Sequence, residues 1–205
     1  MFGLTKDELR LLRGLDSAGK IQDYLDSITI NHEPEGDTCL SPRRVMRERR
    51  AHCLESAMLA AVAFRLHGQP PLVLDLTSNV HDFDHVIALY KRHGCWGAVS
   101  KTNHAVLRFR EPVYRTLREL VLSYFHEYFN EDGYKTLRSY SRPVDLSRFD
   151  SQGWITSEDD VWFVERYLYD VKHYPLLNRA QIATLRKAHP MEMKAGEIVE
   201  WKAAG

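Results

Sequence analysis

Cys53 stands at the start of a predicted helix, in the stretch RAHCLESAMLAAVAF at residues 50–64. Its neighbours His52, Glu55 and Ser56 are polar, whereas the helix becomes almost wholly apolar one turn later. A cysteine kept only for packing as a small hydrophobic residue would suit the apolar middle of the helix better. At a helix N-terminus the macrodipole favours the thiolate, which is the nucleophilic form of the side chain. Taken alone, Cys53 is more typical of a small apolar residue packed at a helix end, and the nucleophile hypothesis depends on the residues downstream.

His85 is the acid–base partner that the sequence offers for Cys53. A free thiol is largely protonated at neutral pH, so cysteine catalysis needs a group that accepts the proton and later protonates the leaving group. His85 opens the predicted strand HVIALY, and the next predicted strand runs into the polar residues SKTN. A polar side chain there can orient the imidazole. The candidate catalytic residues are therefore Cys53, His85, Asn103 and Ser100.

Three stretches together resemble the transglutaminase-like superfamily of papain-type cysteine enzymes. They are CLESAMLAAVAFRLHGQPP at 53–71, HVIALY at 85–90 and GCWGAVSKTN at 94–103. The usual family pattern is a cysteine that opens a helix of the form C-x-x-x-A-x-L-x-x-A-x-R-x-x-G-x-P. A strand histidine follows, and then a tryptophan strand that ends in D-P-T-N. The likeness covers roughly residues 17–110, about half the chain.

Ser100 stands where the family has the triad aspartate, four residues after the tryptophan, although the T-N that follows matches. A serine can accept a hydrogen bond from imidazole, but it cannot stabilise an imidazolium with a charge. Asn103 can orient the histidine as asparagine does in papain-like enzymes, and we rank it equal with Ser100. Asp82 ranks lower. Asp84 directly precedes the histidine in an extended stretch and is expected to point to the opposite face.

The resemblance implies acyl transfer from an amide or peptide carbonyl, with water preferred to a lysine amine as acceptor and with no cofactor. Cys53 would attack the carbonyl, His85 would relay the proton, and a backbone N–H near the helix start would help to hold the oxyanion. The expected partner is a peptide or an amide-containing substrate, which includes proteins. The alternative is an inactive relative that binds a peptide or protein partner in the same cleft, which Ser100 favours.

A metal-dependent hydrolase is a third interpretation, based on the histidines and aspartates of residues 81–93. His81 and His85 would share one face of a helix, but VHDFDHVIALY is predicted to be loop and strand. The stretch also lacks the glutamate of H-E-x-x-H. We therefore expect no catalytic metal.

Capping and breaker signals outline the elements that position these residues. Helices are expected at Thr5–Gly14, from about Ser17, from Ser41-Pro42, over 53–66, over 113–125, from Ser157 toward Pro175, and over RAQIATLRKA. Strands are expected at LVLDL, HVIALY, CWGAVS and HAVLRFR, as an antiparallel sheet. The arginines of residues 43–50 are expected on a solvated helix face, with binding of an acidic substrate or a raised potential near the cysteine as the alternative.

The predicted fold class is α+β, with a transglutaminase-like core in which the helix at 53–66 is buried against the antiparallel sheet. Residues 1–112 are expected to form this core with its N-terminal helices. Residues 113–205 are expected to form a mainly helical extension packed on the core.

Composition narrows the class of protein further. Lysine plus arginine equals aspartate plus glutamate at 28 each, so net charge gives no reason to expect nucleic acid or an anionic membrane as partner. No apolar run approaches the roughly 20 residues of a membrane span, and the N-terminus does not read as a secretory signal. The cytoplasm is the expected compartment. Cys39, Cys53 and Cys95 show no paired spacing, so we expect free thiols, with Cys39 and Cys95 structural.

Overall fold

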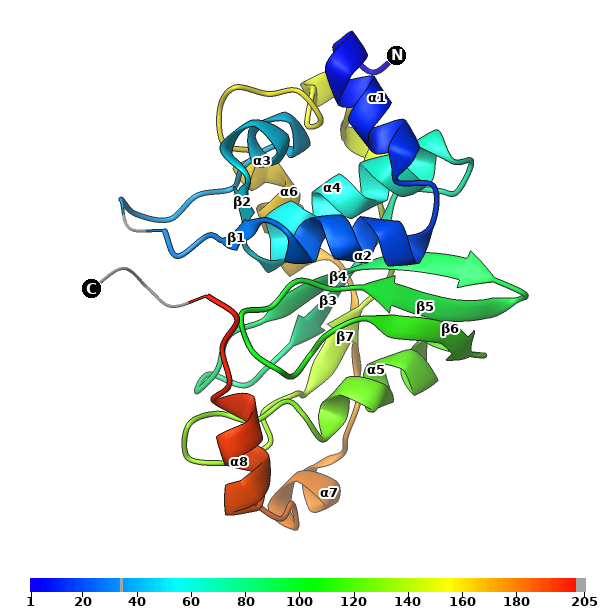
Figure 1. Cartoon of the computed structure of the whole chain (residues 1–205). Coiled ribbons are helices and arrows are strands. Elements are labelled where there is room, and N and C mark those ends of the chain that lie inside the picture. The colour runs from blue at the N-terminus through cyan, green and yellow to red at the C-terminus, as the bar shows by residue number, and fades with distance from the viewer. Residues whose placement is uncertain (34, 202–205) are drawn as a thin grey trace.

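The computed structural model of the chain describes residues 1–33 and 35–201 and shows an α+β fold. A seven-stranded sheet runs in the order β6-β5-β4-β3-β7-β9, with β8 paired to β3, and every pairing in it is antiparallel. Helices cover both faces of this sheet (Figure 1). Two further strands form a separate parallel pair.

The helices are α1 (Lys6–Gly14), α2 (Ala18–Asp26), α3 (Pro42–Glu48), α4 (Cys53–Leu66), α5 (Leu117–Phe125), α6 (Trp162–Asp170), α7 (Arg179–Ala183) and α8 (Pro190–Gly196), with a 3-10 helix at Leu146–Gln152. The strands are β1 (Thr29–Ile30), β2 (Arg50–Ala51), β3 (Leu72–Thr77), β4 (His85–Arg92), β5 (Cys95–Val99), β6 (Arg110–Tyr114), β7 (Ser139–Ser141), β8 (Val144–Asp145) and β9 (His173–Pro175).

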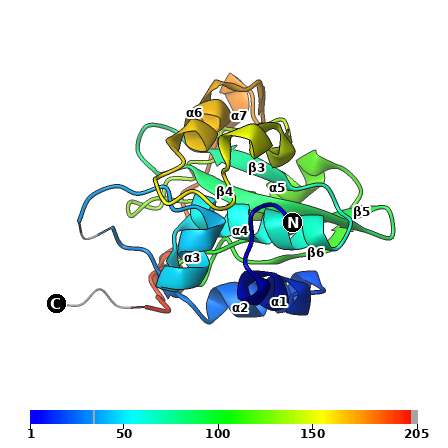
Figure 2. The same cartoon turned by 90° about the horizontal axis from the view of Figure 1, so that it is seen from above.

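Helix α4 is the centre of the larger core. Every residue from Leu54 to Phe64 is buried, and Figure 2 shows α4 surrounded by α1, α2, α3 and α6 above the sheet. Its alanines favour the helix and let neighbouring elements approach closely. Gly68, at φ +82°, and Pro70 end it, because an α-helix cannot continue through either. Each fully buried large apolar side chain in it contributes about 1.5–3 kcal/mol.

The alternation of side chains along β4 separates two hydrophobic clusters. Val86, Ala88 and Tyr90 face the cluster that contains α4, whereas Ile87 and Leu89 face the cluster that contains α5. This two-residue period is the geometry of any strand that is buried on both faces. The sheet therefore stands between two cores, and the start of β4 and the end of β5 lie at the same end of the antiparallel pair.

Gly97 sets the spacing between β4 and β5. It pairs with Tyr90, and a Cβ atom on Gly97 would lie 2.5 Å from Cζ of that ring. The Tyr90 ring is itself held by stacking on Phe64 of α4, with 5.4 Å between ring centroids. The ring therefore has little room to move away.

Gly97→Ala is expected to lower the free energy of unfolding by about 1–3 kcal/mol, because it overpacks a fixed aromatic ring. Chemical denaturation of the purified variant measures this. Gly19→Ala is the matched control, because its Cβ would meet nothing within 4 Å inside α2, and it should stabilise by about 0.4–1 kcal/mol. Equal stabilities for the two variants would contradict this account.

Several sequence-based predictions of elements are confirmed. Helix α1 has the Thr5–Glu8 capping box, Ser17 caps α2, and Ser41-Pro42 starts α3. Helix α4 has the predicted bounds, and strands β3, β4 and β5 lie in the predicted stretches.

Other predictions of elements were wrong. Residues 104–109 are not a strand but a loop that contains Leu107 at φ +60°, and β6 begins at Arg110. Helix α5 starts only at Leu117, because Thr116 caps it. Helix α6 starts at Trp162 rather than Ser157, because the intervening residues form turns. Only residues 179–183 of RAQIATLRKA are α-helical.

The second half of the chain differs from the expected helical extension. The expected boundary at residue 112 falls inside β6, and β7, β8 and β9 join the same sheet as β3. These strands are only two or three residues long, which is too short to show an alternating pattern in the sequence.

Across residues 1–33 and 35–201, none of the helices has the length and apolar character that crossing a membrane requires.

Candidate active site

Cys53, His85 and Ser100 lie at the ends of three elements that meet. Cys53 is the first residue of α4, His85 is the first residue of β4, and Ser100 directly follows β5. The parallel pair of β1 and β2 leads the chain into Cys53. The β4–β5 register, in which Ala88 faces Val99, carries Ser100 to the His85 end of the sheet. The convergence expected from the sequence is therefore present.

Ser100 orients the imidazole of His85. Its Oγ lies 2.7 Å from Nε2 of His85, and its hydroxyl donates to the carbonyl oxygen of Leu107. A hydroxyl has one proton, so the oxygen of Ser100 must accept from the Nε2–H of His85. This hydrogen bond assigns the tautomer and leaves Nδ1 as the nitrogen that can exchange a proton.

Helix α2 holds Ser100 in place. The side chain of Gln22 accepts from the backbone N–H of Ser100 at 3.0 Å and donates to its carbonyl oxygen at 2.9 Å. The next residue, Lys101, is 1 % exposed, and its Nζ donates to the carbonyl oxygens of Leu25 and Ile28 at the end of α2. Hydrogen bonds thus hold both the backbone of Ser100, through Gln22, and its hydroxyl group, through Leu107.

The other candidates for the orienting group have different partners. The side-chain amide of Asn103 bonds the backbone N–H and carbonyl of Trp201, each at 2.9 Å. Asp82 accepts from Thr136 and from Phe83, and Asp84 accepts from Ser78. Among residues 1–33 and 35–201, Ser100 is thus the candidate that hydrogen-bonds His85.

Two imidazoles act on the thiol of Cys53, which is partly exposed. Burial alone would raise the pKa of this thiol. Hydrogen bonding and the positive charge of His52 and His85 outweigh that effect, so the pKa of Cys53 lies well below its ordinary value. The thiolate is therefore the favoured form of the side chain at neutral pH.

His52 is the residue of this candidate site that sequence reasoning missed, although it is the direct neighbour of Cys53. Its Nε2 lies 3.1 Å from the carbonyl oxygen of Thr38 and 3.4 Å from Oε1 of Glu55. Burial would lower the pKa of His52, but the interactions with Cys53 and Glu55 raise it to about 10. The H-C-x-E spacing was the available signal.

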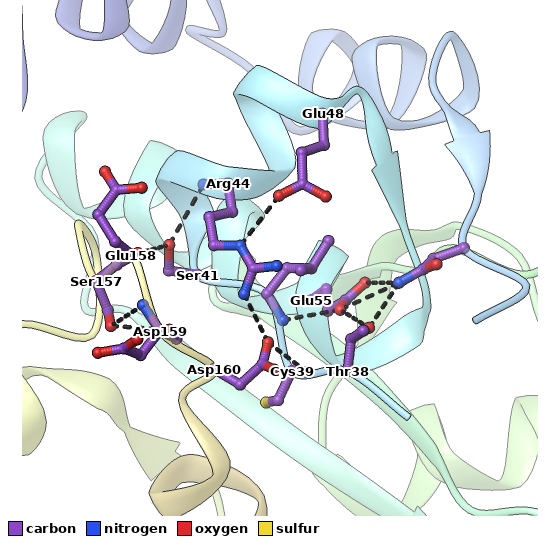
Figure 3. Close-up of polar contacts among 12 residues, drawn as sticks. Thr38, Cys39, Ser41, Arg44, Glu48, Glu55, Ser157, Glu158, Asp159 and Asp160 are labelled. Atoms are coloured by element: carbon purple, nitrogen blue, oxygen red, sulfur yellow. Dashed lines mark hydrogen bonds and ion pairs between the residues drawn. The ribbon is translucent and has the colours of Figure 1, made fainter. Parts of the chain in front are cut away.

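Glu55 is a fully buried carboxylate at the start of α4, with a relative exposure of 0 %. It accepts hydrogen bonds from the backbone N–H of His52 at 2.9 Å, from that of Leu40 at 2.8 Å and from the hydroxyl of Thr38 at 2.9 Å. Asn31 adds a further donor (Figure 3). These donors compensate for the loss of water around a buried charge.

The remaining cysteines lie in different environments. Cys39 is fully buried, and burial raises the pKa of its thiol far above the usual value. Its backbone is fixed by a hydrogen bond from the N–H to Asp160 and one from Val161 to its carbonyl oxygen. All three cysteines lie in the described part of the chain and are free thiols.

Four arginines of α3 and β2 form ion pairs with carboxylates of the same chain. Arg43 binds Glu8 at 2.8 Å, and Arg44 bridges Glu48 and Asp160 at 3.0 and 2.7 Å (Figure 3). Arg47 binds Glu158 and Arg50 binds Glu48. These contacts indicate a structural role, in which α3 is tied to α1 and to the loop before α6.

A cavity of about 1390 Å³ adjoins His85 on the side of the sheet covered by the C-terminal helices. Its lining includes His85, Tyr128 and Glu197, but Cys53 is not part of it. Gly196, at the end of α8, and the following Glu197 also line it, and the next residue, Ile198, accepts from the N–H of Ala105 at 2.9 Å. Of the candidate catalytic residues, His85 is therefore the one that lines this cavity.

The described residues bring together a thiol of lowered pKa, two imidazoles, a buried carboxylate and an orienting hydroxyl. Within residues 1–33 and 35–201, no three histidine, cysteine, aspartate or glutamate side chains are grouped to hold a metal ion. This arrangement can supply a nucleophile, a proton carrier and a fixed countercharge.

A scan against protein-family models found no match for the chain, and no curated protein matches it.

Proposed function

We propose that this chain is a cysteine-dependent amide or peptide hydrolase or acyltransferase with a transglutaminase-like, papain-type core. The observation that carries the proposal is that α4 starts at Cys53 and β4 starts at His85, in an arrangement where the imidazole of His85 helps to lower the pKa of the Cys53 thiol. That imidazole is oriented by Ser100. The order of helix cysteine, strand histidine and polar residue after the next strand supports the papain-type core.

The site supports a complete acyl-transfer cycle. Nδ1 of His85 takes the proton of the Cys53 thiol, and the thiolate attacks the carbonyl carbon to form a tetrahedral oxyanion. The first N–H groups of α4 have no intrahelical acceptor and can donate to that oxyanion. The protonated His85 then gives its proton to the leaving amine as the C–N bond breaks, which leaves a thioester on Cys53.

Water is the acyl acceptor that we propose. His85 removes a proton from the water molecule as its oxygen attacks the thioester carbon. The C–S bond then breaks, the carboxylic acid leaves, and the proton on His85 returns the Cys53–His85 pair to its starting state. The cavity beside His85 gives the leaving amine space on the side of the group that protonates it. The substrate is therefore a peptide or another amide.

A second candidate function is a binding module that holds a peptide or protein in the same cleft without chemistry. Ser100 favours it, because a hydroxyl cannot stabilise the His85 imidazolium with a charge. The two functions differ in one property. A binding module has no need for a reactive thiol, whereas a hydrolase requires one.

The rate of alkylation of Cys53 against pH tests the proposed function. In wild type, iodoacetamide should modify Cys53 well below the pH at which a simple thiol, with a pKa of about 8.5, reacts. His85→Ala should move the profile toward higher pH, because one of the two imidazoles that lower the pKa of Cys53 is lost. Peptide mass spectrometry assigns the modified residue.

N-acetylcysteine in the same buffers provides the reference profile. Cys39 is an internal control, because it is fully buried and burial raises its pKa, so it should stay unmodified in the folded protein. If Cys53 follows the reference thiol in wild type, the hydrolase proposal is wrong and the binding module is favoured.

A further inference from the structure

Within residues 1–33 and 35–201, the hydrogen-bond partner of the His85 ring is the neutral hydroxyl of Ser100 and not a carboxylate. A thiolate–imidazolium pair needs charge stabilisation, which an aspartate behind the histidine would supply. Ser100 uses its hydroxyl proton on Leu107 and only accepts from His85. Ser100 therefore supplies no charge to the thiolate–imidazolium pair, and the remaining place for a stabilising charge is next to the Cys53 sulfur.

His52 occupies that place, and acceptors surround it. The carbonyl oxygen of Thr38 lies 3.1 Å from its Nε2, Oε1 of Glu55 lies at 3.4 Å, and Oε1 of Glu33 lies at 3.8 Å. With three acceptors around Nε2, that nitrogen carries a proton. The side chain of Cys53 is a further hydrogen-bond partner of the ring, and a proton on each ring nitrogen makes the ring an imidazolium.

Glu55 needs a cation because it is a buried carboxylate. It is 0 % exposed, and His52 contacts it both through the backbone N–H at 2.9 Å and through the ring. A buried charge is tolerated only when it is paired and hydrogen-bonded. Glu33, which is partly exposed, is the second carboxylate that faces His52.

We infer that His52 is a positioning residue of the site, a permanent imidazolium held by Glu55 that stabilises the Cys53 thiolate in place of the acid missing behind His85. The inference rests on the proposed function, which it deepens. Charges then alternate along Glu55, His52, Cys53 and His85. His85 alone carries the proton of the reaction, and His52 keeps both of its protons throughout.

The raised pKa of His52, about 10, agrees with an imidazolium that persists through neutral pH. The groups that face it are Glu55 of α4, Glu33 and the Thr38 carbonyl of the loop before α3, and Cys53. The groups that face Cys53 are the rings of His52 and His85.

The test compares the alkylation profile of Cys53 in the full chain of wild type, His52→Gln and Glu55→Gln. His52→Gln should lower the rate at pH 6 by about tenfold or more, since a shift of one pKa unit is a tenfold change in thiolate at that pH. Glu55→Gln should act in the same direction. His52→Lys, which restores a positive charge without a ring, should recover part of the rate.

Glu158→Gln is the matched control, because this carboxylate is exposed and binds Arg47, and its profile should equal that of wild type. Glu55→Gln removes a buried network, so its folding is checked by circular dichroism. The ring resonance of His52 in wild type gives a result that needs no variant. It should stay at its protonated shift from pH 6 to 8.

The outcomes separate this inference from the proposed function. If wild-type Cys53 reacts at low pH but His52→Gln keeps the same profile, or if the His52 ring titrates between pH 6 and 8, the role of His52 is overturned and the hydrolase proposal stands. If wild-type Cys53 behaves as an ordinary thiol, both fail.

Discussion

Cys53→Ala is expected to reduce amide hydrolysis by about 10³-fold or more, to the background rate, because no other group in the site can form the acyl intermediate. His85→Ala should cause a loss of similar size, since the thiolate and its proton carrier act as one unit and their effects are not additive. The measurement is the initial rate on a panel of peptidyl aminocoumarin amides, chosen because their cleavage is visible whatever the sequence preference.

Ser100→Ala should cost less, about tenfold, because it removes one neutral hydrogen bond that is worth about 1–1.5 kcal/mol. The ordering of the three variants therefore distinguishes bond-forming from orienting groups. Cys95→Ala is the matched cysteine control, at the start of β5, and should keep the wild-type rate. If Cys53→Ala or His85→Ala retains the activity found in wild type, this mechanism is wrong.

Helix α4 and the strands beside it could be predicted from the sequence because their signals are local. The apolar run of α4 is bounded by polar residues at Cys53 and by Gly68 and the prolines after it. Strands β3 and β4 are short apolar runs between breakers. A helix start, a strand start and the end of the next strand also have few ways to meet, so the proximity of Cys53 and His85 was predictable.

The choice between Ser100 and Asn103 could not be made from the sequence. Asn103 is engaged by Trp201, which lies 98 residues further along the chain, and Ser100 is fixed by Gln22, 78 residues before it. Local patterns carry no information on such distant partners. The strand expected at 104–110 failed for the same reason, since His104 pairs with Val199 instead of with the sheet.

His52 was overlooked because its role depends on what becomes buried. A histidine and a glutamate three residues apart at a helix start suggest only a cap. Thr38 and Leu40, which precede α3, donate hydrogen bonds to Glu55, and this carboxylate at a capping position is fully buried. Burial then forces the carboxylate to keep a cation, and the nearest is His52.

Lys101→Met is expected to lower the free energy of unfolding by about 1–3 kcal/mol, because it removes the ammonium donor from the carbonyl oxygens of Leu25 and Ile28, of which Leu25 keeps a bond from the N–H of Ile28. Lys101 is 1 % exposed, and its Nζ lies 2.7 Å from the carbonyl oxygen of Leu25 and 2.8 Å from that of Ile28. Burial lowers the pKa of this ammonium group, so part of the loss is offset by the removal of a charge that is costly to bury.

Methionine matches the length of the lysine stem, so the variant changes the hydrogen bonds and charge with little change in packing. Lys20→Met is the control, since the Nζ of Lys20 forms an exposed ion pair with Asp16 at 2.9 Å and should contribute less than about 1 kcal/mol. Urea denaturation of both variants measures the difference. The bonds from Lys101 to the carbonyl oxygens of Leu25 and Ile28 hold the chain directly after Ser100. If both variants lose the same free energy of unfolding, Lys101 does not anchor this end of β5, and the backbone of Ser100 is held by Gln22.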